Sequence, residues 1–272
     1  MKKNWAKTPL TDGGSITALI PVTNRKFLYF LTILGAYFLY LTNVFKTDLL
    51  LRTQGTLCNA LLFILAITLF HTDTKPFFNK GKGFFHLLEL CVTLYFTTIA
   101  VNIALSFLIH VDDPQNLSRF MYDFSLPYVT YNIIKYFFVG VGEECFKLFI
   151  FLLLFGLFHV VARGRHKKIN CILAVILTSF FFGALHNFYA PENWIAITIP
   201  IAASTMVYFY YLFKHKTILP LMITHAFHDI FIFLTLMNGY SEMNESIITL
   251  FLMILFLIFG CKSLFLKKPQ IA

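Results

Sequence analysis

The 272-residue chain is 58% hydrophobic and 18% aromatic, whereas only 13% of its residues are charged, about half the share that soluble domains carry. A soluble core could not bury this much apolar surface, so the composition excludes a soluble globular protein and indicates a polytopic membrane protein. A net charge of +9 is compatible with binding to nucleic acid or to an anionic membrane, and the position of the basic residues decides between these two partners.

The chain begins with 26 polar and basic residues that contain no apolar core, which predicts a cytoplasmic leader and not a cleavable signal peptide. A bilayer core of about 30 Å needs about 20 apolar residues of helix. The apolar stretches of suitable length lie at 27–45, 54–71, 84–110, 128–162, 169–189, 194–213, 217–237 and 247–266. They lack period-2 alternation, so they predict an all-α protein with eight membrane-spanning helices.

The fourth stretch, 128–162, is too long for one perpendicular span and predicts an oblique helix that starts at the outer surface. Lys135 and Asp123 lie near its outer end and are interpreted as interfacial residues. There is no repeat and no linker long enough to separate a second domain. We therefore expect one transmembrane helical domain over 27–268, with its polar motifs within 128–237, and a short tail over 269–272.

Most basic residues fall in alternate connections between the apolar stretches, which places them on one side of the membrane. These connections hold Lys2, Lys3, Lys7, Arg25, Lys26, Lys75, Lys80, Lys82, Arg163, Arg165, Lys167, Lys168, Lys214, Lys216, Lys262, Lys267 and Lys268. The positive-inside rule then predicts that both termini are cytoplasmic. Membrane topology thus explains most of the positive charge, with lipid headgroups as partners, and nucleic-acid binding is left without support.

All five cysteines lie within apolar stretches and none forms a CxxC pair, so neither a zinc ribbon nor a disulfide framework is expected. They are interpreted as small hydrophobic residues of the helices.

Charged residues inside the fourth stretch need a reason, because each costs about 2.5–3.5 kcal/mol at mid-bilayer on insertion scales. The sequence VGVGEECFKLFIF carries Glu143, Glu144 and Lys147. Glu143 and Lys147 are four residues apart and share a helix face, which favours an ion pair between them, whereas Glu144 points about 100° away. A purely structural alternative is this ion pair with Glu144 hydrogen-bonded to a neighbouring helix.

Two further stretches deliver polar groups to the membrane interior. His186 ends the run SFFFGALHNFY, in which Gly183 permits close helix approach. In ITHAFHDIF, His225 and Asp229 share a face at i and i+4, and His228 lies about 60° to one side. Taken singly, each is more often structural. Together with the two glutamates they suit a general base that activates water and groups that stabilise an oxyanion.

In order and in placement on separate helices, these motifs resemble the superfamily of type II CAAX prenyl proteases and their bacterial relatives, the CPBP family. That family has a double glutamate followed by arginine, then FxxxH, then HxxxN or a similar pair. Here the matching residues are Glu143, Glu144, Phe182, His186, His225 and Asp229. Leu148 occupies the arginine position. Lys147 in EECFK and Asp229 in HAFHD are instead similar to the PrsW family, although PrsW proteins usually have glutamate where His186 stands.

The resemblance implies an intramembrane endopeptidase in a bacterial cytoplasmic membrane, which cleaves a membrane-embedded or lipidated protein or peptide without a cofactor. It implies that Glu143 and His186 polarise the hydrolytic water, and that His225 with Asp229 orients or stabilises the oxyanion. Glu144 and Lys147 are implied to support them, and His228 is added as a further supporting residue.

Three alternatives remain open on the residues alone. Glu143, His186 and His225 could instead ligate zinc, although HExxH is absent. Buried Glu, Lys, His and Asp also occur in proton-coupled transporters, but no inverted repeat is visible. A noncatalytic membrane scaffold or immunity protein could retain the fold, and leucine at position 148 is compatible with that.

Overall fold

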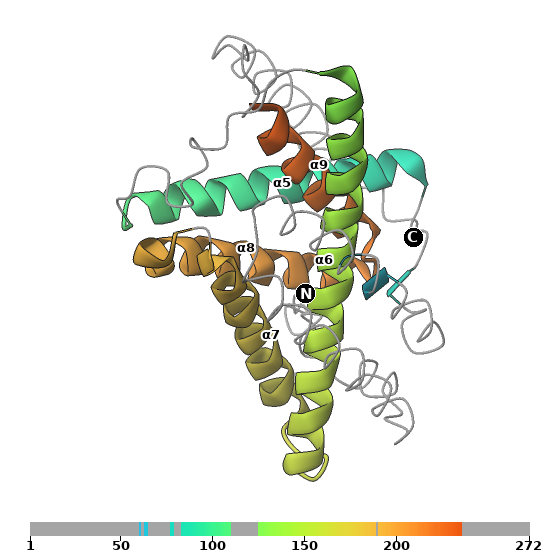
Figure 1. Ribbon diagram of the computed structural model, residues 1–272. Helices are drawn as coiled ribbons and strands as arrows, with labels where there is room; N and C mark the ends of the chain where they lie inside the picture. The colour runs from blue at the N-terminus through green and yellow to red at the C-terminus, as the bar shows by residue number, and fades with distance from the viewer. Residues whose placement is uncertain are drawn as a thin grey trace, which may run out of the picture.

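The computed structural model is helical almost throughout the part of the chain that it describes, with an isolated β-bridge between Phe78 and Thr217. That part comprises residues 60, 63, 64, 77, 78, 83–109, 125–188 and 190–235. The long helices are α5 (Phe84–Ser106), α6 (Leu126–Val161), α7 (Lys167–Ala184), α8 (Trp194–His215) and α9 (Leu219–Thr235). Two 3₁₀ turns, η3 (Leu185–Phe188) and η4 (Pro191–Asn193), join α7 to α8 (Figure 1).

The helices coincide with five of the predicted stretches, so the prediction of a helical membrane protein is confirmed there. Four of them are long and apolar enough to cross a membrane: α5, α6, α7 continued into η3, and η4 continued into α8. α9 is a shorter apolar helix. The predicted spans 27–45 and 247–266, most of 54–71, the leader and the tail lie outside the described residues. The count of eight spans and the orientation of the termini therefore stay predictions.

The long fourth helix is present as α6, with 36 residues and a length of about 54 Å, well beyond the thickness of a bilayer core. Pro127 lies in its first turn, where proline is tolerated because the first N–H groups have no partner within the helix. Figure 1 shows α6 running across α5 and α8 and not alongside them. Helices that cross in this way cannot all stand along the membrane normal. The crossing does not fix which of them is tilted, so the oblique course of α6 stays a prediction.

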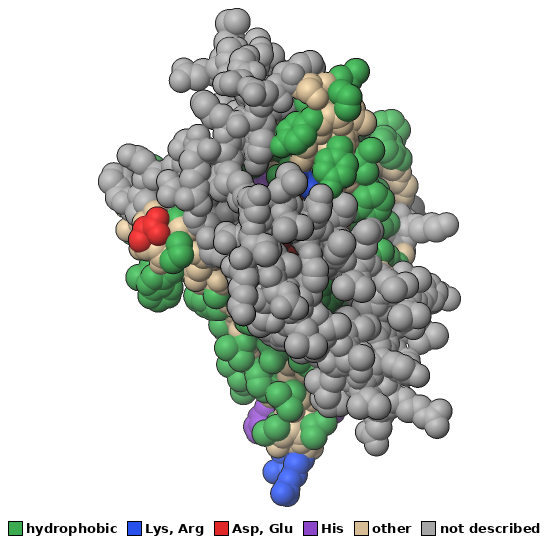
Figure 2. Space-filling view, in the orientation of Figure 1, with side chains coloured by type: hydrophobic (Ala, Val, Ile, Leu, Met, Phe, Trp, Pro, Cys, Tyr) green, Lys and Arg blue, Asp and Glu red, His purple; other side chains and the backbone are tan. Residues whose placement is uncertain are grey.

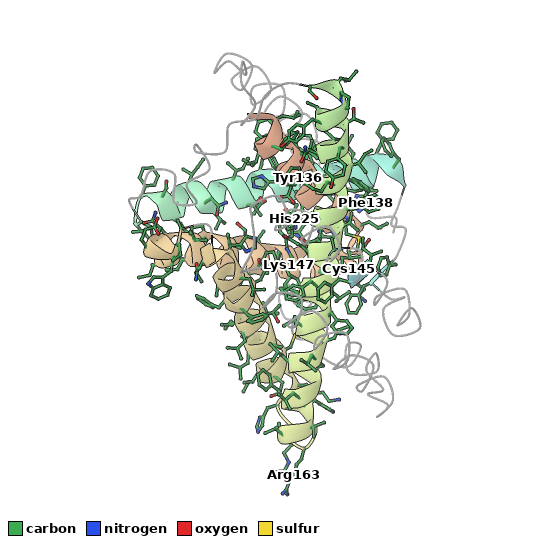
Figure 3. All side chains as sticks on the ribbon, viewed as in Figure 1. Tyr136, Phe138, Cys145, Lys147, Arg163 and His225 are labelled. Carbon is green, nitrogen blue, oxygen red and sulfur yellow. The ribbon has the colours of Figure 1, made fainter. Side chains whose placement is uncertain are left out.

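A tight basic turn ends α6 and starts α7. Arg163, Gly164 and His166 adopt positive φ angles of 49°, 77° and 56°, which reverse the chain within a few residues. In the space-filling view the lowest tip of the molecule is blue, and Figure 3 labels Arg163 there (Figures 2 and 3). Hydrophobic side chains cover most of the described surface above this tip (Figure 2), as expected for helices that contact lipid.

An aromatic cluster packs the lower half of α6 against α8. The Phe151 ring centroid lies 5.2 Å from that of Phe209, 5.3 Å from that of Phe213 and 5.9 Å from that of Phe155. Phe151 and Phe155 are buried almost completely. Edge and offset contacts of this kind stabilise packing beyond the burial of apolar area. They hold against α8 the part of α6 that follows the polar residues at 143–147.

Glycines set the closest helix contacts near these polar residues. A Cβ atom on Gly140 would lie 2.5 Å from the backbone nitrogen of Ala226 and 2.9 Å from the carbonyl carbon of His225. A Cβ atom on Gly183 would lie 2.5 Å from the carbonyl oxygen of Thr198. Backbone stands directly against backbone at both crossings, so the absence of a side chain at Gly140 places α9 against α6 at the level of His225.

Replacing Gly140 with valine is expected to destabilise the protein by about 1–3 kcal/mol, because α9 must move away from α6 to make room. Thermal unfolding in detergent measures the loss. Ala100→Val is the matched control, since Ala100 is exposed on α5 and has space for the added methyl groups. Equal unfolding temperatures for the two variants would contradict the close α6–α9 contact.

Candidate active site on α6, α7 and α9

One imidazole joins the polar residues of α6 and α9. His225 Nδ1 lies 2.7 Å from Glu144 Oε1, and His225 Nε2 lies 3.3 Å from Glu143 Oε2. On α9 itself, Asp229 Oδ1 lies 3.6 Å from the same Nε2 atom. The predicted pairing of His225 with Asp229 at i and i+4 is confirmed, and the helices bring both glutamates to the same ring.

The contacts of His225 fix its orientation. A carboxylate can only accept a hydrogen bond, so the 2.7 Å contact makes Nδ1 the donor to Glu144. Nε2 is then directed at Glu143 and Asp229, where it presents a second N–H whenever the ring carries both protons. The ring is further confined by the edges or faces of Phe182 and Tyr208, at 6.3 and 6.2 Å between centroids.

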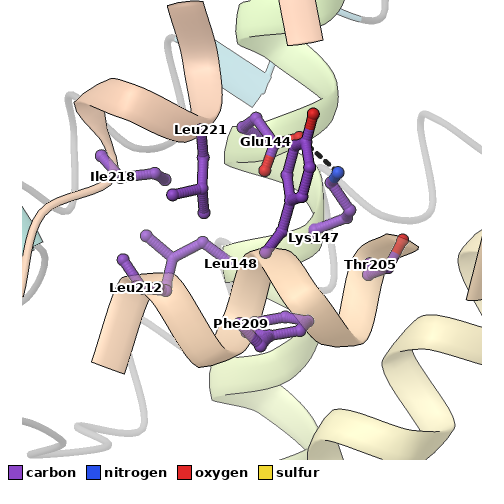
Figure 4. A pocket seen from close by; sticks show the side chains of 9 residues that line it. Glu144, Lys147, Leu148, Thr205, Phe209, Leu212, Ile218 and Leu221 are labelled. Carbon is purple, nitrogen blue, oxygen red and sulfur yellow. Dashed lines mark hydrogen bonds and ion pairs between the residues drawn. The ribbon is translucent and has the colours of Figure 1, made fainter. Parts of the chain in front are cut away.

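The ion pair on α6 differs from the predicted one. Lys147 pairs with Glu144 at i and i+3, and not with Glu143 at i and i+4 (Figure 4). Tertiary contacts explain the difference, because the Lys147 ammonium lies 4.6 Å from the Phe182 ring centroid and 4.7 Å from that of Tyr208. These rings of α7 and α8 hold the ammonium beside Glu144, and Glu143 contacts His225 instead.

Exposure separates the two glutamates. The side chain of Glu143 is 23% exposed, whereas that of Glu144 is only 2% exposed and that of Lys147 only 4%. Glu144 thus has a fully enclosed position between an ammonium and an imidazole. Of the two glutamates, Glu143 is the one that solvent can reach.

His186 lies at the end of α7, in the turn η3. Its Nδ1 atom lies 2.9 Å from the carbonyl oxygen of Phe182, so Nδ1 carries a proton and Nε2 is the acceptor in the neutral ring. The Phe182 ring packs edge-on against His186 at 4.8 Å, and both Glu143 and His225 are near enough to act on His186 electrostatically. The turn is held to α8 by a 3.0 Å hydrogen bond that Thr198 Oγ1 donates to Asn187 Oδ1.

Two other polar residues of the apolar stretches lie elsewhere. The His228 ring is exposed and lies beside Tyr95 of α5, at 6.1 Å between centroids, on a different side of α9 from His225. Glu89 pairs with His86 on α5, at 3.6 Å between Nδ1 and Oε2. The structure therefore does not bring His228 to the two glutamates, and its supporting role stays an untested prediction.

A small cavity adjoins the Glu144–Lys147 pair. It is only large enough for about one water molecule. Its lining is formed by Glu144, Lys147, Leu148, Thr205, Tyr208, Phe209, Leu212, Ile218 and Leu221 (Figure 4). Leu148 is almost completely buried and lines this cavity beside Lys147.

Metal binding by Glu143, His186 and His225 finds no added support. Within the described ranges, no three His, Cys, Asp or Glu side chains are grouped as ligands of a metal ion are. The prediction that no cofactor is needed remains untested.

Some residues around the site carry no signal in the sequence. Tyr208 is one aromatic residue of an apolar helix, and only the fold places its ring on Lys147. The side chain of Lys135 is only 5% exposed, which the sequence did not indicate, and its interfacial position in the membrane stays a prediction. One turn before it, Asn132 is 2% exposed.

The part of the chain that holds Glu143, His186 and His225 also matches a known family. Residues 125–231, which run from the start of α6 into α9, match the family described as Type II CAAX prenyl endopeptidase Rce1-like. This confirms the resemblance to the CAAX prenyl proteases for that segment. The PrsW-like features have no support from this match and stay a prediction. No curated protein and no solved structure gives a significant match to the chain.

Proposed function

We propose that the chain is a membrane-embedded endopeptidase, the activity in the name of the family that residues 125–231 match, and that it cleaves with an activated water molecule. The observation that carries this proposal is the position of His225. Its imidazole contacts the accessible Glu143 through one nitrogen and the enclosed Glu144 through the other. A base and a hydrogen-bond donor are thus held together in an apolar surrounding.

Glu143 is proposed as the general base. It takes a proton from a water molecule held between it and Nε2 of His186, and the resulting hydroxide attacks the carbonyl carbon of the substrate. Glu143 then passes the proton to the leaving amine as the carbon–nitrogen bond breaks. The products are a carboxylic acid and an amine, so one water molecule is consumed and no cofactor takes part.

His225 is proposed to stabilise the oxyanion through its Nε2–H group. An ionised Asp229 cannot donate a hydrogen bond to that oxygen, so its role is to orient His225. Glu144 holds the opposite nitrogen, and Lys147 neutralises Glu144. The enclosed pair thereby keeps the imidazole in one orientation without contact with the substrate.

The substrate proposed for the first test is a prenylated peptide that ends in a C-a-a-X sequence, in line with the family's name. Purified protein in liposomes is expected to cleave it, and in ¹⁸O-labelled water the new carboxyl group is expected to gain one labelled oxygen. The rate should not change when a chelator is added. Loss of activity on chelation with recovery by zinc would replace the metal-free mechanism, and proton flux without any cleavage would favour a transporter.

A further inference from the structure

Lys135 is a buried cation that the proposed chemistry does not use. It lies in the first third of α6, and only 5% of its surface is exposed. Among the described residues, its ammonium makes a cation–π contact with the neighbouring Tyr136, 4.3 Å from the ring centroid. No carboxylate of the described helices opposes the effect of burial on its charge, whereas Lys147 has Glu144 beside it. An ammonium in such a position is a candidate binding group for an anion.

Asn132 adds a second polar group at the same place. It precedes Lys135 by three residues, about one helical turn, and is 2% exposed. Its Nδ2 atom donates one hydrogen bond to the carbonyl oxygen of Tyr128, at 2.9 Å. The Asn132 side chain also hydrogen-bonds to the side chain of Tyr128, so its amide is engaged within α6. The Lys135 ammonium is therefore the group at this turn that is left to hold an oxyanion such as a carboxylate.

The distance from Lys135 to the proposed base is set by α6. Two i, i+4 steps separate Lys135 from Glu143, so the residues lie on the same side of the helix, about 80° apart and about 12 Å apart along its axis. α9 runs beside α6 over this distance. Phe233, two turns beyond His225 on α9, packs on Tyr136 of α6, with 5.4 Å between the ring centroids. An extended peptide covers about 3.3 Å per residue, so 12 Å corresponds to three or four residues.

We propose that Lys135 binds the free C-terminal carboxylate of the peptide substrate and thereby places the scissile bond, three to four residues upstream, at Glu143. This inference rests on the proposed peptidase function. It explains how an endopeptidase site would select a bond near a chain end. The carboxylate supplies the countercharge that the buried ammonium lacks in the described part of the protein.

The test uses two farnesylated peptides of identical C-a-a-X sequence, one with a free C-terminal carboxylate and one with a C-terminal amide. Binding is measured by fluorescence polarisation with the Glu143→Gln variant, so that the result does not depend on turnover. The acid is expected to bind about ten- to a hundredfold more tightly than the amide, the range for a hydrogen bond to a charged group. Adding Lys135→Met should remove this preference, and adding Lys135→Arg should keep most of it.

Controls separate this role from others. Lys168→Met removes one positive charge from the exposed start of α7 and should leave the preference unchanged. A structural role for Lys135 would weaken binding of acid and amide equally, which would overturn the inference. The binding measurement is repeated with anionic lipid added. A preference that this lipid abolishes would also overturn the inference, since it would assign Lys135 to a lipid phosphate. Equal binding of acid and amide overturns it even if wild-type protein cleaves both, whereas absence of cleavage with a retained preference counts against the peptidase mechanism alone.

Discussion

Glu143→Gln is expected to lower kcat for peptide cleavage by about 10²–10⁴-fold, the usual contribution of a general base. Glutamine keeps the size of the side chain and can still accept a hydrogen bond through its carbonyl oxygen, but it cannot take a proton from water. Because the side chain is 23% exposed and one of several contacts of His225, the fold should be retained. The KM for the peptide should change much less than kcat.

The measurement is cleavage of the prenylated peptide under single-turnover conditions, with unfolding temperature as a check on folding. Glu89→Gln is the matched control, because Glu89 is also a carboxylate of an apolar helix but pairs with His86 away from the site. Its rate should equal that of wild type. If Glu143→Gln also cleaves at the wild-type rate, Glu143 is not the base.

Lys147→Met is expected to destabilise the protein by about 3–5 kcal/mol, the cost of leaving one partner of a buried ion pair uncompensated. Glu144 is 2% exposed, and among the residues that the structure describes it would keep His225 as its one remaining partner. Methionine fills a volume similar to that of the lysine stem between Phe182 and Tyr208, so the loss should come from charge and not from a cavity.

Denaturant-induced unfolding in detergent measures this loss, and a double variant reveals its cause. Glu144→Gln combined with Lys147→Met removes both charges and should recover a large part of the stability. Lys214→Met is the control, since the Lys214 ammonium also lies over an aromatic ring, that of Tyr210 at 5.3 Å, but is exposed. A double variant as unstable as Lys147→Met alone would mean that packing of the lysine stem, and not the buried charge, is what stabilises this region.

The positions of the helices could be predicted from the sequence because membrane thickness sets the length of an apolar span. Stretches at 84–110, 128–162 and 194–213 became α5, α6 and α8 with shifts of only a few residues at most ends. The short loops of the described part carry proline, glycine or basic residues, which ended the apolar runs visibly. Helix periodicity, which brings residues i and i+4 to one face, also predicted the pairing of His225 with Asp229 correctly.

The choice of partners around Glu143 and Glu144 was decided by tertiary structure. The spacing on α6 favoured Glu143 for Lys147, since helix geometry alone brings i and i+4 together. In the folded protein Phe182 and Tyr208, from two other helices, hold the ammonium at Glu144, and His225 from α9 contacts both glutamates.

What the sequence alone determined is therefore the membrane class, the course of the described helices and the set of polar residues from which a site could be built. Only the tertiary structure decided that Glu143 is accessible while Glu144 is enclosed, and that the Lys135 side chain is buried. The physical reason is that composition and periodicity report how a helix meets the bilayer. Exposure and ion pairing inside the bundle depend on which helices cross, and glycines such as Gly140 set how closely they do so.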